Sequence, residues 1–226
     1  MSRLNLAFVT TLALTLVTIA PSSADAQTRV VSSSYSTGGV ATAKATGRGN
    51  ANISAHAAAS GGGVAHATMH GSGRFGGQAT GSAIAASHGG VAIANGHSKA
   101  HGWNAQSHSD ALAASQYGVA IANDQAIAYG NASATSMSGA LTTGGVAIAN
   151  GSAIGKGYFG GRADASNLSI SAVDYGYGVA NGSATAVGVF GGDAITDNGA
   201  IAIGTGGYQS STSHASGQAI GGYLPW

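Results

Sequence analysis

The sequence predicts an all-β protein, a narrow β-solenoid (parallel β-roll or β-helix) of about 27-residue repeats, each made of two half-repeats. Three observations support this fold class: a six-residue unit recurs, large and small side chains alternate within it, and no proline lies between residues 22 and 224. Alternation with a period of two is typical of β-strands. A continuous sheet excludes proline because proline cannot donate a backbone hydrogen bond.

The recurring unit is Gly-Val-Ala-Ile-Ala-Asn. Full copies begin at Gly90, Gly118 and Gly145, and weaker versions begin at Gly39, Gly63, Gly178 and Gly199. A spacing of roughly 27 residues, with insertions and deletions, is typical of a repeat architecture. In an extended strand the Val and Ile side chains fall on one face and the alanines on the other. The Gly and Asn residues supply the positive φ angles of tight corners.

The number of residues in each coil is left open by the repeat. If each half-repeat of 13 to 14 residues formed one coil, about 15 coils would make a rod of roughly 70 Å at the usual strand spacing. If each coil takes the full repeat, the rod is about half as long. The small alanines favour the narrower coil.

The two ends of the chain differ from the repeats. Arg3 precedes an apolar run over residues 6–20, and Ala24-Asp25-Ala26 offers a cleavage site, so residues 1–26 are predicted to be a secretory signal peptide. We expect residues 27–38 to lead into a solenoid domain over 39–207, and residues 208–226 to form a C-terminal cap or tail. The mature chain is therefore predicted to be extracellular or at the cell surface, without membrane insertion.

The composition excludes several classes of protein. The chain has 39 glycines, no cysteine and only 7% charged residues. A disulfide framework is excluded, and so is a core filled by large side chains. With 44% hydrophobic residues the chain also lacks the usual composition of a disordered linker.

Short units of the form Asn-Gly-Ser-Ala-Ile-Gly occur between residues 145 and 204, starting at Asn150, Asn181 and, with Ala after the Gly, at Asn198. They resemble the head repeats of trimeric autotransporter adhesins, the YadA-like family. The resemblance implies left-handed parallel β-rolls that assemble as trimers and bind host or matrix surfaces. The stalk and membrane anchor of that family have no counterpart in this sequence.

A weaker resemblance is to curli-type amyloid subunits, which are also small, secreted, glycine-rich and free of cysteine. Gln116-Tyr117-Gly118, after Ser109 and Asp110, looks like one such repeat. This resemblance implies a self-assembling fibre. The regularly spaced Gln/Asn ladder of that family is not visible in the sequence.

No catalytic or cofactor-binding residues are predicted, and we expect a protein that is not an enzyme. The aspartates are scattered, whereas paired-carboxylate catalysis needs two acids held close together. His108-Ser109-Asp110 contains the letters of a catalytic triad, but consecutive residues of a strand point to alternate faces. Two Gly-x-Gly-x-x-Gly segments, at Gly71 and Gly155, lack the strand–helix context of a nucleotide site.

Polar side chains recur at fixed distances after the repeat starts and predict a solvent-facing interaction column. Histidines i and i+4 on a strand lie about 13 Å apart, so one ion could be held only by neighbouring coils, for instance His70 above His97. A solvated polar column is the simpler interpretation, and no metal ligands are assigned. The column consists of His70, Arg74, His97, His101, Tyr129 and Lys156.

Charge divides the chain into two halves. Residues 27–109 carry five basic residues and no acid, whereas residues 110–226 carry two basic residues and six aspartates. A rod with this distribution is a dipole that attracts its own copies at low salt, and the basic charge is too weak to predict nucleic-acid binding. We expect a structural or adhesive protein whose partners are itself and surface or matrix components. A curli-type fibre subunit and a ligand- or metal-binding solenoid are the alternatives.

Overall fold

A computed structural model describes residues 27–74, 77–158, 162–173, 176–189, 193–204 and 207–220. Within these ranges the chain is all-β, and no helix is long and apolar enough to cross a membrane. The predicted signal peptide, residues 1–26, lies outside the described residues. The strands are β1 (Gln27–Thr37), β2 (Val40–Arg48), β3 (Asn50–Ser60), β4 (Val64–Gly73), β5 (Gln78–His88), β6 (Val91–Gln116), β7 (Val119–Thr142), β8 (Gly145–Gly157), β9 (Ala163–Val173), β10 (Gly176–Val189), β11 (Ala194–Gly204) and β12 (Gly207–Ile220).

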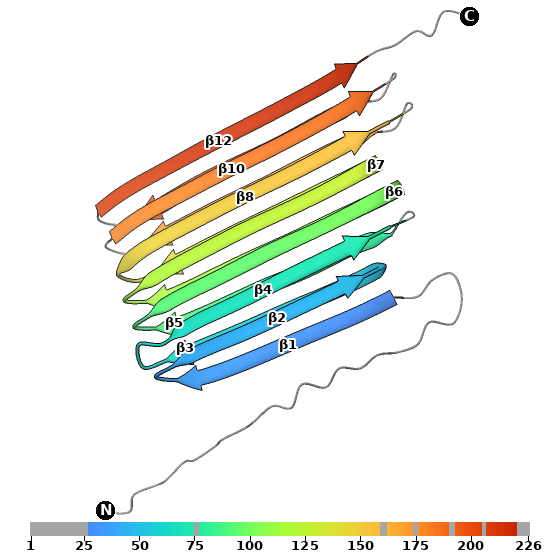
Figure 1. The fold of residues 1–226 in the computed structure, drawn as a ribbon. Helices are drawn as coiled ribbons and strands as arrows, with labels where there is room; N and C mark the ends of the chain where they lie inside the picture. Colours follow the sequence, from blue (N-terminus) through green and yellow to red (C-terminus); the bar gives the residue numbers. More distant parts are fainter. Residues whose placement is uncertain are drawn as a thin grey trace, which may run out of the picture.

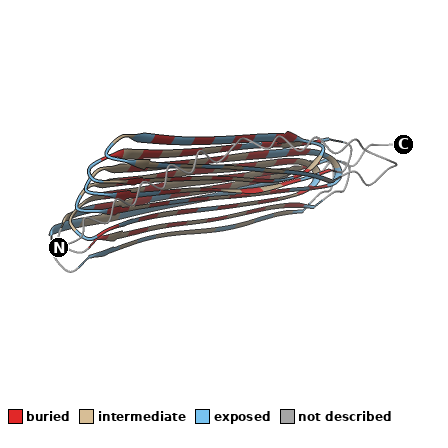
Figure 2. Cartoon of the chain, turned by 90° about the horizontal axis from the view of Figure 1, so that it is seen from below, coloured by how far each residue is buried: buried red, intermediate tan, exposed pale blue. Residues whose placement is uncertain are grey.

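The strands form two flat parallel faces that lie back to back (Figures 1 and 2). In Figure 1 the strands of the front face run in the opposite direction to those behind it. The long strands β6 and β7 turn a corner, so each contributes one half to each face. Face 1 contains β1, β3, β5, residues 105–116, residues 132–142, β9 and β11. Face 2 contains β2, β4, residues 91–102, residues 119–129, β8, β10 and β12.

The structure confirms the β-solenoid and decides the size of its coil. Val91 lies opposite Val119, and Val119 lies opposite Val146, so one coil takes a full repeat and contains one strand from each face. The solenoid has about six turns, or roughly 30 Å along its axis. The expectation of a narrower coil was wrong. Alanine side chains determine how closely the two faces approach each other. They do not determine the length of each strand, and therefore not the number of residues in a coil.

The alternation predicted from the sequence places alanine inside. Ala92, Ala94, Ala120 and Ala122 are fully buried between the faces, as are most alanines of the other coils. The Val and Ile side chains of the same units point outward and are half-buried by their neighbours on the next coils. Figure 2 shows the resulting alternation of buried and less buried residues along the inner strands.

A column of glycines marks the start of each strand on face 2. The Val119 amide donates to the Gly90 carbonyl, and the Val146 amide donates to the Gly118 carbonyl, each at 3.0 Å. A Cβ atom added to Gly118 would overlap the Gly90 carbonyl oxygen. The column admits only glycine because successive backbones approach each other so closely.

The repeat starts assigned to Gly178 and Gly199 were wrong. Gly176, not Gly178, lies opposite Gly145. Gly199 belongs to β11 on face 1, where it lies opposite Leu168. The C-terminal coils contain more residues than the central ones, so counting a fixed period along the sequence loses the register there.

The sheet extends beyond the predicted domain limits of 39 and 207. β1 occupies most of the predicted lead-in and pairs along its whole length with β3. At the other end β12 enters the predicted tail and pairs with β10. The described part of the solenoid therefore begins and ends with strands.

Candidate functional site

Two of the predicted column residues stack on neighbouring coils. His70 of β4 lies opposite His97 of β6 on the outside of face 2. Their rings are parallel within 12°, with centroids 4.8 Å apart. Burial, and next the charge of His70, lower the pKa of His97. The lowered pKa favours the neutral form of His97 in the stack.

A second group lies four positions further along the same strands. His101, Tyr129 and Lys156 occupy successive coils in register, and Lys156 Nζ lies 5.6 Å from the centre of the Tyr129 ring. Lys99, which the sequence analysis did not single out, approaches the same ring at 5.4 Å. Cations at this distance are attracted to an aromatic face. Arg74 is exposed just after β4, beyond its last residue paired with β6.

An asparagine ladder runs between the histidine stack and the outward isoleucines. Asn123 donates to Asn95, Asn150 donates to Asn123, and Asn181 donates to Asn150, each at 2.9 Å. The Asn95 amide extends the ladder to His66 Nε2. Asn95, Asn123 and Asn150 each end a full copy of the Gly-Val-Ala-Ile-Ala-Asn unit. The register adds Asn181, which follows Asn150 after a longer coil.

Part of the outside of face 1 is apolar. Leu112, Met137, Leu141 and the isoleucines of β11 are exposed there. Leu141 and Ile203 line an open groove of about 610 Å³ together with the outward alanines Ala86, Ala114 and Ala172. Exposed apolar surface of this kind is typical of a surface that contacts another molecule.

The letters of the apparent triad do not come together. His108 and Asp110 point outward from face 1 and form an ion pair at 3.0 Å, and this hydrogen bond raises the pKa of His108. Ser109 points inward and is fully buried. The alternation expected from the strand therefore places the serine on the opposite side of the sheet from the histidine.

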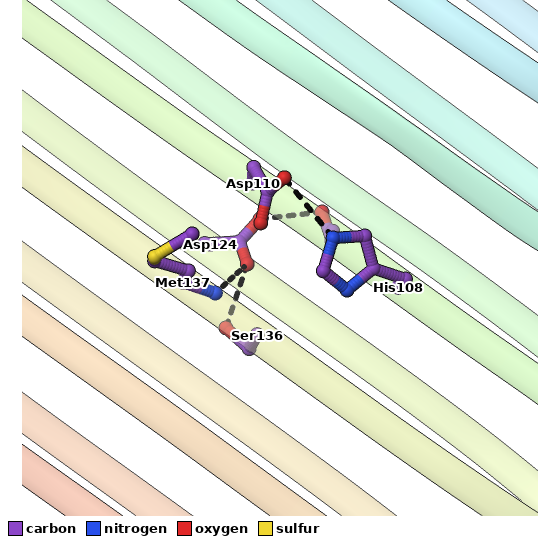
Figure 3. A network of polar contacts seen from close by, with 6 residues as sticks. His108, Asp110, Asp124, Ser136 and Met137 are labelled. Atoms are coloured by element: carbon purple, nitrogen blue, oxygen red, sulfur yellow. Dashed lines mark hydrogen bonds and ion pairs between the residues drawn. The ribbon is translucent and has the colours of Figure 1, made fainter.

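Ser109 instead belongs to a buried polar cluster around Asp124. Figure 3 labels Asp124, Ser136 and Met137 of this cluster. The Asp124 side chain crosses the interior from face 2 and accepts hydrogen bonds from the hydroxyls of Ser109 and Ser136 and from the Met137 amide. Burial raises the pKa of Asp124 to about 7. Sequence reasoning missed this cluster, although one signal was present. Asp124 stands in register where the neighbouring coils have Gly96 and Gly151, and its carboxylate fills the space that Gly96 leaves.

Within the described ranges, no three His, Cys, Asp or Glu side chains gather in an arrangement that could hold a metal ion. No family model, curated protein or solved structure matches the chain.

We expect Asn123→Ala to lower the free energy of unfolding by about 1 kcal/mol, because the substitution removes two ladder hydrogen bonds in the middle of face 2. Chemical denaturation measures the change. Ser152→Ala is the control and should have a smaller effect. Ser152 is the next outward residue after Asn150 on β8. Equal effects of the two substitutions would show that the ladder adds no stability.

Proposed function

We propose that this chain is a secreted, non-enzymatic repeat protein with a structural or adhesive role at the cell surface or in an extracellular matrix. The observation that carries the proposal is the exposed apolar patch on the outside of face 1. Leu112 lies opposite Gly139, between Met137 and Leu141 of the next coil, and among the described residues no element covers these side chains. Such a surface is suited to contact with another surface, since water exclusion stabilises the contact in proportion to the apolar area buried.

Two features of the sequence support an extracellular location. Residues 1–26 have the layout of a signal peptide. The Asn-Gly-Ser-Ala-Ile-Gly units resemble YadA-like adhesin heads, and in the structure they lie in β8 and β10 of a parallel β-solenoid. An extracellular adhesive role is consistent with both.

Protease added to intact producing cells should degrade the protein, because we expect it outside the membrane. A matched variant, Leu14→Arg, interrupts the apolar run over residues 6–20 and should keep the chain inside, protected from the protease. A cytoplasmic protein serves as the lysis control. Protection of the unmodified chain would contradict export and with it the proposed role.

The adhesive surface has its own test. Leu112→Ser combined with Leu141→Ser should release the exported protein from the surface or matrix into the medium, since both side chains are exposed on face 1. Val91→Ser with Val119→Ser changes the outside of face 2 and is the control. Equal retention of both variants would place adhesion elsewhere.

A second candidate function is that of an amyloid-like fibre subunit. The asparagine ladder favours it, because stacked amides between in-register parallel strands also stabilise cross-β fibres. Growth of dye-binding fibres from the purified protein would favour this function over the first. Soluble particles of constant size at high concentration would count against it.

A further inference from the structure

Both ends of the described solenoid present open strand edges. Face 1 begins with β1 and ends with β11, and both strands contain 11 residues. Face 2 begins with β2 and ends with β12. Within the described residues nothing covers the outer edge of any of these four strands, so each presents unpaired backbone groups that another parallel strand could pair with.

Following the register from coil to coil shows which residues a second copy would bring together. Arg29 lies opposite Asn52 in the first pairing of face 1, and Asp197 lies opposite Ser166 in the last. The pairings between them connect these residues into one outward column. The column reads Arg29, Asn52, Thr80, His108, Thr135, Ser166 and Asp197. A further coil added after β11 in the same register would therefore place an Arg29 next to Asp197.

The neighbouring columns also match. The same register would place Tyr35, 69% exposed, beside Ile203, 57% exposed. On face 2 it would place Val40, 68% exposed, beside Tyr208, 58% exposed. These are among the most exposed large apolar side chains of the described chain. On joining, the two side chains of each pair would cover each other.

The inward positions at the join are small enough to allow close stacking. Ser32 would lie beside Ala200, and Ser34 would lie beside Ala202.

The charges of the two ends also favour the join. The first coil carries the exposed cations Arg29, Lys44 and Arg48, whereas the last carries the exposed anions Asp193 and Asp197.

We propose that copies of this chain join end to end, with β11 and β12 of one copy pairing in continued register with β1 and β2 of the next, and with Arg29 beside Asp197 across the join. The partner is a second copy of this chain, and the product is a continuous solenoid that grows by roughly 30 Å per copy. The join specifies the partner in the proposed structural role. It rests on that proposed function, because it assumes that the protein acts outside the cell.

Charge reversal tests the join in the exported, purified protein. Arg29→Asp places like charges on neighbouring strands and should raise the concentration needed for half of the copies to join by about tenfold. Asp197→Arg should have the same effect, and the double variant should restore joining. Sedimentation velocity and negative-stain images of rod length at about 50 mM salt measure it, and about 500 mM salt should shorten the rods.

Lys44→Asp is the matched control, because it changes the net charge as Arg29→Asp does but faces the neutral Thr212 in the continued register. Asp197→Arg should therefore not rescue it. Compact particles instead of rods in the wild type, or a double variant no better than the single ones, would overturn the join. Neither result bears on export, which the protease experiment on intact cells tests separately.

Discussion

Gly118→Ala is expected to lower the free energy of unfolding by about 4 kcal/mol, an unusually large effect for one methyl group. The φ angle of Gly118 is outside the left-handed region, so alanine can adopt this backbone conformation. The cost arises instead from the added Cβ, which would overlap the Gly90 carbonyl and approach the Ser115 hydroxyl. Relieving the overlap would separate two coils and weaken the hydrogen bond from Val119 to Gly90.

Gly139→Ala is the matched control for this prediction. Its Cβ would meet only the Leu112 Cδ1 atom at 3.0 Å, and that atom is the end of a flexible, exposed side chain. We expect a change within about 1 kcal/mol, because the methyl also restricts the unfolded chain. Chemical denaturation of both variants measures the difference, and equal midpoints would mean that the glycine column is not required for close stacking.

Asp124 should make the stability of the protein depend on pH. Burial raises its pKa in the folded state to about 7, whereas the ordinary value is 3.8. Between these values the folded chain holds a proton that the unfolded chain has released, so stability falls as pH rises. The stabilisation is complete below about pH 4 and lost above about pH 7. Three pH units correspond to about 4 kcal/mol.

Asp124→Asn removes this titrating group and should flatten the curve between pH 4 and pH 8. Denaturation midpoints at several pH values give the comparison with the wild type, and the difference isolates Asp124 from the histidines that both proteins share. Asp193→Asn removes an exposed charge, and this control variant should keep the wild-type fall. A wild-type curve as flat as that of Asp124→Asn would show that the carboxylate is ionised throughout.

The sequence predicts those features that depend on local patterns. Alternation within Gly-Val-Ala-Ile-Ala-Asn is a property of a single strand, and it predicted the inward alanines of the solenoid because every coil repeats it. Features that depend on the longer C-terminal coils were misplaced. The coil between Asn150 and Asn181 is longer than those before it, so the repeat starts counted from a fixed period fell on Gly178 and Gly199.

The interior shows the same limit. Ser109, Ser136 and Asp124 are each compatible with an ordinary surface position when read alone. They meet because the two faces bring them together from three strand segments. Only the replacement of glycine by aspartate within an otherwise repeated unit indicated that position 124 differs from Gly96 and Gly151.

The direction of the hydrogen bonds has a mechanical consequence. In a solenoid the bonds between coils lie along the axis, and each coil contacts only its neighbours. A pull between the two ends therefore loads one ladder at a time and peels the terminal coil before the next. Each coil released would add about 90 Å of extended chain. Under tension such a rod would lengthen in steps, and each step would dissipate part of the work done by the pulling force.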